Sequence, residues 1–339
     1  DSSRLYKKKE KQQVELIERI LDDENIRAAI QAVQSKKGAP GIDKMPVGAL
    51  KSYFAEHGEE IKDQIRDKKY QPQPVRRVYI PKANGKMRPL GIPVVVDRVI
   101  QQAVAQVLSR GYERYFSEFS YGFRVNRDCH MAIEKALEYL NDGYEWVVDL
   151  DIEKYFDTVN HDKLISILRE RINDAPTLHL IRSFLKAGVM EEGLVSPTEE
   201  GVPQGGPLSP VLSNVYLDKL DKELEGRGLH FARYADDCNI FVRSEKAADR
   251  VMTSVTDWLE QKLRLKVSAS KTKVVRPNDS AFLGFTFWNS KEGWKPKPLE
   301  ARKDKLRKKI QEILCRRRAA AQPLSYVFTK LNQVLRGWI

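Results

Sequence analysis

YEWVVDLDIEKYFD at residues 144–157 and FARYADDCNIFV at residues 231–242 are the stretches that decide the fold. The first begins with an apolar run that ends on aspartates, which is typical of a buried strand. The second carries Asp236 and Asp237 between two apolar runs, which predicts a hairpin of two strands with both aspartates at its turn. The central strands of the predicted sheet therefore carry aspartates at their ends.

Further elements are predicted on either side of these stretches. The predicted strands are 76–81, 144–151, 229–235, 238–243, 265–275 and 282–288, and Asn84-Gly85 predicts a hairpin turn after the first of them. The predicted helices are 5–37, 47–68, 97–115, 128–141, 160–171 capped by Asn160, one starting at a Ser209 cap with Pro210 in its first turn, 245–263, and the basic last forty residues. The central order of strand, helix, two strands, helix and strand predicts an α+β sheet with helices on one face.

Composition excludes several classes of protein. The 339 residues are 41% hydrophobic and 31% charged, which excludes global disorder and a fibrous repeat. The longest uncharged stretch, residues 201–217, contains three glycines and three prolines, so we expect no membrane-spanning helix and no membrane partner. The three cysteines match no metal-ligand spacing, and no secretory signal is visible, so we expect a reducing compartment.

Charge is segregated along the chain, whose formal net charge is +12. Residues 62–88 carry nine basic and two acidic residues, and residues 291–318 carry twelve basic and four acidic ones. Residues 134–162 instead carry two basic and nine acidic residues. An acidic region inside a basic protein suggests a metal site within a nucleic-acid cleft, whereas an evenly solvated surface would not be divided in this way.

The paired aspartates are the strongest candidates for chemistry. Strand alternation puts Asp149 and Asp151 on one face, and Asp236 and Asp237 follow a neighbouring strand. A single pair at a turn is more often structural, because aspartate is a common turn residue. Three converging carboxylates would repel one another unless cations lay between them, and Mg²⁺ prefers carboxylate oxygens together with substrate phosphates.

The loop GVPQGGPLSP at residues 201–210 precedes a predicted helix. It could be an ordinary helix-entry loop. Its adjacent glycines and Gln204 also allow the backbone to approach a nucleotide closely.

With these motifs the sequence resembles reverse transcriptases, and most of all the reverse transcriptase/maturases of bacterial group II introns. The similar motifs, in chain order, are Ile80–Pro93, Val148–Asp157, Pro203–Pro210, Tyr234–Asp237, Phe282–Phe285 and Leu335–Trp338. The resemblance implies a right-hand polymerase fold with fingers, a palm built on a split βαβ antiparallel sheet, and the start of a helical thumb. It implies an N-terminal helical extension (1–45), fingers (46–143), a palm with part of the fingers inserted (144–290), and a truncated thumb or maturase region (291–339).

The resemblance also implies roles for individual residues. The site of two Mg²⁺ ions is matched by Asp151, Asp236 and Asp237 together with the backbone of Ile152. Lys271 matches a lysine that protonates the leaving pyrophosphate, although Lys273 fits that chemistry equally well. The residues that match the dNTP site are Arg76, Lys82, Arg88, Gln204 and Phe156, and of these Phe156 would exclude a 2′-hydroxyl. The primer grip is matched by Phe282, Leu283 and Gly284. Asp149 matches no catalytic position.

The implied activity is RNA-directed DNA synthesis from a DNA primer, dNTPs and an RNA template, together with binding of intron RNA, in the bacterial cytoplasm. The alternative is a splicing maturase that binds RNA without polymerising, but the intact acidic triad favours activity. An RNA-templated RNA polymerase is disfavoured by Phe156. The start at Asp1 without Met suggests a fragment. The oligomeric state stays open, and a dimer fits the resemblance as well as a monomer.

Overall fold

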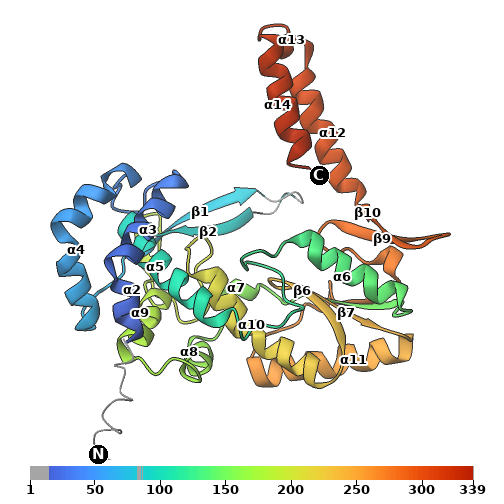
Figure 1. Cartoon of the computed structure of the whole chain (residues 1–339), viewed down its shortest axis with the longest axis horizontal. Coiled ribbons are helices and arrows are strands. Elements are labelled where there is room, and N and C mark those ends of the chain that lie inside the picture. The colour runs from blue at the N-terminus through green and yellow to red at the C-terminus, as the bar shows by residue number, and fades with distance from the viewer. Residues whose placement is uncertain (1–14, 82–84, 86, 339) are drawn as a thin grey trace, which may run out of the picture.

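A four-stranded antiparallel sheet lies at the centre of the computed structural model, which describes residues 15–81, 85 and 87–338 (Figure 1). Its strand order is β6-β7-β3-β8, with bounds His230–Tyr234 (β6), Asp237–Val242 (β7), Trp146–Leu150 (β3) and Lys273–Val275 (β8). Leu150 pairs with Cys238 and Tyr234 pairs with Asp237. This register brings the end of β3 level with the β6–β7 turn, as the paired aspartates predict.

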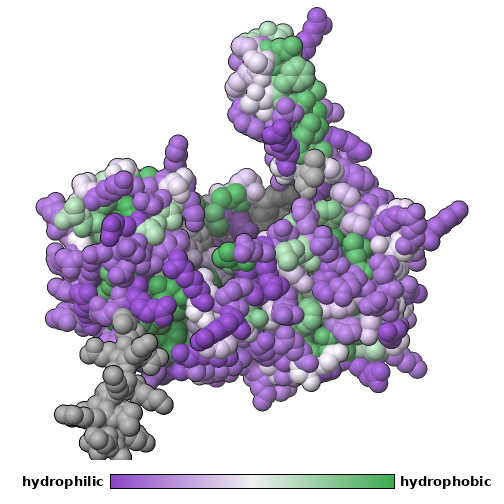
Figure 2. All heavy atoms as spheres, viewed as in Figure 1, coloured by the Kyte–Doolittle hydropathy of each residue, from purple (hydrophilic) through white to green (hydrophobic). Residues whose placement is uncertain are grey.

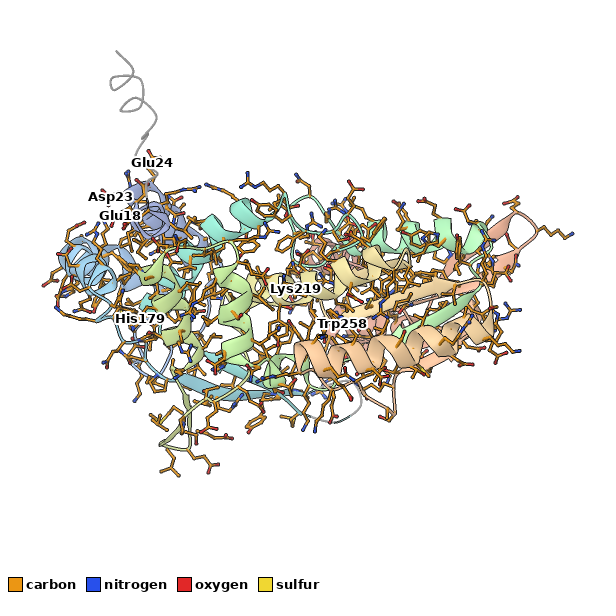
Figure 3. The ribbon with its side chains drawn as sticks, turned by 90° about the horizontal axis from the view of Figure 1, so that it is seen from below. Glu18, Asp23, Glu24, His179, Lys219 and Trp258 are labelled. Carbon is orange, nitrogen blue, oxygen red and sulfur yellow. The ribbon has the colours of Figure 1, made fainter. Side chains whose placement is uncertain are left out.

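Helices cover both faces of this central sheet, so the prediction of helices on one face is wrong. Val147 packs with α6 (Cys129–Asn141) in one buried cluster, whereas Val148 packs in another cluster with α10 (Ser209–Gly226) and α11 (Glu245–Trp258). Figure 1 shows α6 and α11 on opposite sides of the strands, and Figure 3 shows α11, with Trp258 at its end, from below. The reason is that consecutive valines of β3 are both fully buried, which requires a cover on each face.

A second sheet lies toward the N-terminus, with strand order β2-β1-β4-β5. Its strands are Val75–Pro81 (β1), Met87–Ile92 (β2), Val189–Glu191 (β4) and Leu194–Ser196 (β5). The antiparallel pairing of β1 with β2 confirms the predicted hairpin, although Asn84 lies outside the described residues. Strand β4 joins β1 in parallel through two residue pairs, which no local signal predicted.

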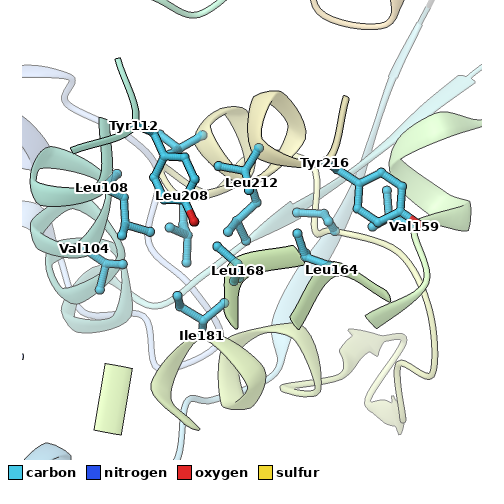
Figure 4. Packing of buried hydrophobic residues seen from close by; sticks show 14 of the residues in the cluster. Val104, Leu108, Tyr112, Val159, Leu164, Leu168, Ile181, Leu208, Leu212 and Tyr216 are labelled. Atoms are coloured by element: carbon cyan, nitrogen blue, oxygen red, sulfur yellow. The ribbon is translucent and has the colours of Figure 1, made fainter. Parts of the chain in front are cut away.

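The remaining helices surround this second sheet and join it to the first. They are α2 (Leu16–Leu21), α3 (Asp23–Ser35), α4 (Leu50–Arg66) after the 3-10 turn η1 (Val47–Ala49), α5 (Val95–Tyr112), α7 (Tyr155–Thr158), α8 (His161–Arg169) and α9 (Ala175–Leu185). Figure 4 shows side chains of α5, α8, α9 and α10 packed in one core, including Leu108, Leu168, Ile181 and Leu212. This shared core fixes α10, and with it the central sheet, relative to the N-terminal sheet.

Several predicted elements differ from those observed. The single helix predicted over 5–37 is two helices within the described residues, because Asp22 leaves helical geometry and its carboxylate accepts hydrogen bonds from the first turn of α3. Of the strand predicted at 265–275 only β8 forms. Ser209 does not cap α10: its hydroxyl donates to the Pro203 carbonyl oxygen at 2.5 Å, and Leu208 occupies the cap position. Asn160 does cap α8, as predicted.

The C-terminal part begins with a short hairpin and continues as a projecting arm (Figure 1). The elements are η3 (Pro277–Asp279), β9 (Phe285–Ser290), β10 (Gly293–Pro298), α12 (Glu300–Leu314), α13 (Arg316–Ala319) and α14 (Leu324–Arg336), and the π-helical η2 (Leu259–Leu263) extends α11. The basic tail is thus helical as predicted, but in three pieces. Val327 is the one buried residue of these three helices, and hydrophobic residues lie on the arm's surface (Figure 2). No helix in the described part of the chain is long and apolar enough to cross a membrane.

Candidate active site

The turn between β6 and β7 carries Asp236. Because Tyr234 pairs with Asp237, the turn consists of only Ala235 and Asp236, and the prediction that both aspartates lie in the turn is wrong for Asp237, which is the first residue of β7. Ala235 has a φ of 57°, in the left-handed region that residues other than glycine usually avoid. The surrounding structure must therefore hold this turn in place.

A buried arginine supports the turn from below. Arg233 and Asp221 of α10 are both fully buried, and two hydrogen bonds join the guanidinium to the carboxylate, from Nε to Oδ1 at 2.6 Å and from Nη2 to Oδ2 at 2.5 Å. The same guanidinium donates to the Ala235 carbonyl oxygen at 2.7 Å and to the Ser120 hydroxyl at 2.8 Å. Sequence reasoning missed Arg233, and its signal was a charged residue inside an otherwise apolar strand.

Gly122 and Asn214 hold the turn from the side. A Cβ at Gly122 would lie 2.4 Å from the backbone nitrogen of Ala235, so only glycine permits this approach. The Asn214 amide donates to the Gly122 carbonyl oxygen at 2.8 Å and is itself buried. The turn is thus fixed on two sides before any ligand arrives.

Asp151 follows β3 and is held by the segment that precedes β8. The Ser268 backbone donates to the Asp151 carbonyl oxygen at 2.8 Å, and the Asp151 backbone donates to the Thr272 hydroxyl at 3.1 Å. Lys271 extends its ammonium group to both carboxylate oxygens of Asp151, each at 3.0 Å. Ile152 is buried and forms a β-bridge with Val267, so the whole segment is fixed at this strand end.

Lys271 and Lys273, which the sequence could not distinguish as proton donors, contact different carboxylates in the structure. Lys273 lies 3.8 Å from the carboxylate of Asp149 and donates to the Asp279 carbonyl oxygen at 3.0 Å. Asp149 also accepts a hydrogen bond from the Ser280 hydroxyl at 3.0 Å, and its burial raises its pKa. Asp149 and Lys273 therefore belong to one pair and Asp151 and Lys271 to another.

The carboxylates at the turn repel one another. Partial loss of surrounding water, followed by repulsion from Asp236 and Asp151, raises the pKa of Asp237 to about 6. Loss of water and then repulsion from Asp151 also raise the pKa of Asp236, while Arg88 and Lys271 oppose that rise. A cation between these groups would relieve the repulsion.

The donor set fits a hard divalent ion that shares its coordination with a substrate. Among the residues that the structure describes, no three His, Cys, Asp or Glu side chains are arranged to hold a metal on their own. Mg²⁺ commonly takes only one or two protein carboxylates and completes its octahedron with water and phosphate oxygens. Asp151, Asp236 and Asp237, mutually repelling and partly open to solvent, suit that mode of binding.

Phe156 and Gln204 line one open cleft of about 360 Å³ beside the β1–β2 hairpin. Phe156 stands on α7, where its ring meets the Tyr155 ring edge to face, while Tyr155 points into the core and donates to the Ser213 carbonyl oxygen. Gln204 accepts a hydrogen bond from Arg88 at 2.9 Å and donates to Asp157 at 3.3 Å. The structure thus brings Phe156, Gln204 and Arg88 together, as the sequence predicts.

A buried histidine that sequence reasoning did not single out holds the loop before Gln204. His161 Nε2 lies 2.7 Å from the Gly201 carbonyl oxygen, and the Val202 backbone donates to the Phe156 carbonyl oxygen at 2.6 Å. Gly201 has a φ of 90°, and a Cβ there would lie 2.9 Å from the same Phe156 oxygen. The positions of Phe156 and of the loop are therefore coupled.

The other predicted site residues lie apart from this group. The Arg76 guanidinium donates to the Pro40 carbonyl oxygen at 2.8 Å, and Lys82 lies outside the described residues. Leu283 and Gly284 form a two-residue turn with φ of 52° and 85°, closed by paired backbone hydrogen bonds between Phe282 and Phe285. Phe282 is buried against the central sheet, so the strand predicted from 282 begins only at 285.

Comparisons with known proteins place this geometry in context. A family model described as reverse transcriptase (RNA-dependent DNA polymerase) matches residues 80–287. Protein YkfC of Escherichia coli K12 is 36% identical in an alignment 310 positions long, and the match covers 79% of this chain and 81% of YkfC. Group II intron-encoded protein LtrA of Lactococcus lactis is 42% identical over 198 residues, which are 57% of this chain but 32% of LtrA. A solved partial Cas6-RT-Cas1–Cas2 complex contains a chain with 26% identity and a TM-score of 0.46, covering 74% of this chain and 43% of that one.

Proposed function

Since this chain belongs to the reverse transcriptase family and is related to group II intron reverse transcriptases, we propose that it extends a DNA primer on an RNA template using dNTPs. The observation that carries the proposal is the register of the central sheet. Leu150 pairs with Cys238, so Asp151 comes level with Asp237 and beside Asp236. Loss of surrounding water and the charge of Asp151 raise the pKa of Asp236 and of Asp237, and a group of carboxylates at a solvent-accessible strand end suits phosphoryl transfer.

Members of the family generally use a divalent metal, and we propose two Mg²⁺ ions here. Asp151, Asp236, Asp237 and the Ile152 carbonyl group would hold them. When bound, the ions would lower the pKa of the primer 3′-hydroxyl and neutralise charge on the triphosphate. The chain itself contributes the fixed turn at Ala235, which orients two of these ligands without reorganisation.

The substrate side of the proposal rests on the cleft beside Phe156. The Arg88 guanidinium would bind triphosphate oxygens, and Gln204, already bonded to Arg88, would fix the nucleotide's position. Phe156 would stand against the sugar and exclude a 2′-hydroxyl by its volume. Lys82 and Arg76 remain proposed triphosphate contacts, although Arg76 is engaged with Pro40.

Lys271 is our proposed proton donor to the leaving pyrophosphate. Its ammonium group contacts Asp151, whereas Lys273 is held by Asp149 and the Asp279 carbonyl oxygen. A general acid must reach the reacting groups, and this favours Lys271 over Lys273.

The lobes of a right-hand polymerase correspond to the observed parts in this proposal. The central sheet with α10 and α11 would be the palm, within residues 144–290, and the sheet β2-β1-β4-β5 with its helices the fingers, part of which is inserted into the palm. The proposed N-terminal extension over 1–45 would precede them, and its residues 1–14 lie outside the described part of the chain. Helices α12 to α14 would begin the thumb, and the turn at Phe282–Gly284 would grip the primer. The surface is hollowed between the N-terminal part and the arm, as a duplex would require (Figure 2).

The test is primer extension on an RNA template with Mg²⁺ present or chelated. Asp236→Asn should abolish extension while leaving RNA binding largely intact, because the basic surfaces are unchanged. Asp257→Asn, on the exposed side of α11, is the matched control and should extend normally. Substantial extension by Asp236→Asn would refute the metal assignment.

We further propose that the chain binds group II intron RNA as a maturase. The similarity to LtrA supports this, as do the twelve basic residues of 291–318, most of them on the exposed arm. A maturase that does not polymerise is the alternative, and it predicts intron-RNA binding with no extension by the wild-type protein. Such a protein would act in the bacterial cytoplasm, as a monomer or a dimer.

A further inference from the structure

The segment 120–127 carries two exposed apolar side chains beside the proposed metal site. Phe123 is 48% exposed and Val125 is 72% exposed, whereas Gly122 and Arg124, which alternate with them, are buried. Ser120 and Gly122 support the Ala235 turn, but neither Phe123 nor Val125 has a part in the proposed function. We propose that Phe123 is a contact residue for the primer–template duplex, with its ring against the sugars and base edges next to the reacting end.

The segment is anchored on both sides of Phe123. The Tyr121 backbone donates to the Arg233 carbonyl oxygen at 2.8 Å, and Gly122 is pressed against the Ala235 turn and accepts a hydrogen bond from Asn214. These contacts tie the residue before Phe123 to the same turn that carries Asp236.

Arg124 anchors the other side. Its guanidinium is buried, donates to the carbonyl oxygens of Ser117 and Ser120, and forms an ion pair with Glu113 at 2.7 Å. A side chain between two such anchors keeps a fixed position relative to Asp236.

Phe123 also adopts a strained backbone. Its φ is 59°, in the left-handed region that is unfavourable for an aromatic residue. Internal packing gives little in return, because half the side chain is exposed and no aromatic or cationic partner stacks on it among the described residues. A strained aromatic residue that is held rigidly and left open to solvent is typical of a ligand contact.

The surroundings of Phe123 indicate which ligand would contact it. Gly122 contacts the backbone of the turn that carries Asp236, so a nucleic acid whose reacting end lies at Asp236 would run close to Phe123. An uncharged ring suits the apolar surface of sugars and bases rather than phosphates, so its removal should weaken binding of the nucleic acid. This inference rests on the proposed function for the identity of the duplex.

The test compares Phe123→Gly, Phe123→Tyr and the control Val125→Ala. The measurements are the thermal unfolding midpoint and the Kd for a primer–RNA duplex, taken in chelator so that no chemistry is needed. Phe123→Gly should unfold at the same or a higher temperature, because glycine accepts the positive φ, yet should bind the duplex at least about fivefold more weakly. Phe123→Tyr should restore binding, and Val125→Ala should change it less than about twofold.

Other outcomes would overturn either this inference or the proposed function alone. A lower unfolding midpoint in Phe123→Gly with unchanged binding would make Phe123 a packing residue and overturn the inference. Unchanged binding at an unchanged midpoint, or a wild-type protein that does not bind the duplex, would also overturn it. A wild-type protein that binds the duplex, loses binding in Phe123→Gly and yet extends no primer would refute only the proposed function.

Discussion

Asp221→Asn tests the buried support of the proposed metal site. The substitution keeps the side chain's shape but removes its negative charge, which leaves the fully buried Arg233 guanidinium with neutral acceptors. One of the two hydrogen bonds at 2.5 and 2.6 Å becomes a contact between two donors. Breaking a buried ion pair in this way costs about 3–5 kcal/mol, a large part of the roughly 5–15 kcal/mol that stabilises a typical protein.

The matched control is Glu223→Gln, two residues further along α10. Glu223 forms an ion pair with Arg227 at 2.8 Å, but both side chains are about 30% exposed, so the loss should be only about 0.3–0.5 kcal/mol. Equilibrium urea unfolding of both variants measures the difference. Primer extension at a temperature where Asp221→Asn stays folded should also fall, because Arg233 would no longer fix the Ala235 carbonyl oxygen. Equal unfolding costs for the two variants, or unimpaired extension by folded Asp221→Asn, would refute the reasoning.

Three other outcomes are expected. Phe156→Ala should raise the kcat/KM for an rNTP relative to its dNTP by about tenfold or more, whereas truncating the buried Tyr155 should lower stability instead; an unchanged ratio would make Phe156 a plain packing residue. RNA affinity should fall with salt at a log–log slope of about −4, and neutralising the basic residues of 291–318 should flatten that slope without altering nucleotide choice; a slope near zero in the wild-type protein would mean that these charges are only solvated. Because the folded pKa of Asp237 is about 6 against an ordinary 3.8, the stability that protonation gives the metal-free protein is lost as pH rises through about 6. Unfolding midpoints in chelator should therefore fall from about pH 5 to about pH 7 in wild type and fall less in Asp237→Asn, and equal falls would contradict the repulsion at the turn.

The sequence predicted those parts of the fold that depend on local signals. The β6–β7 hairpin and β3 follow from apolar runs, and the closeness of Asp151 to Asp236 and Asp237 follows from strand ends that carry aspartates. The N-terminal sheet was only half predictable, because β4 and β5 are three residues each and β4 pairs with a strand more than a hundred residues earlier. The different partners of Lys271 and Lys273 were beyond prediction, since they depend on where β8 begins.

Several turns have a feature that the sequence alone does not reveal, which is backbone strain balanced by tertiary contacts. Ala235 and Leu283 hold left-handed backbone angles at residue types that seldom adopt them, so the sequence does not indicate these angles. Tertiary contacts hold both turns. The Arg233 guanidinium, which is bound to Asp221 of α10, donates a hydrogen bond to the Ala235 carbonyl oxygen. Next to Leu283, the Phe282 side chain is buried against the central sheet. Phe123 repeats the arrangement, anchored through Asn214 and Arg124. Because Ala235 and Phe123 lie next to the proposed metal ligands, part of the stability of the surrounding structure maintains their strained geometry, and a bound nucleic acid is the partner that would use it.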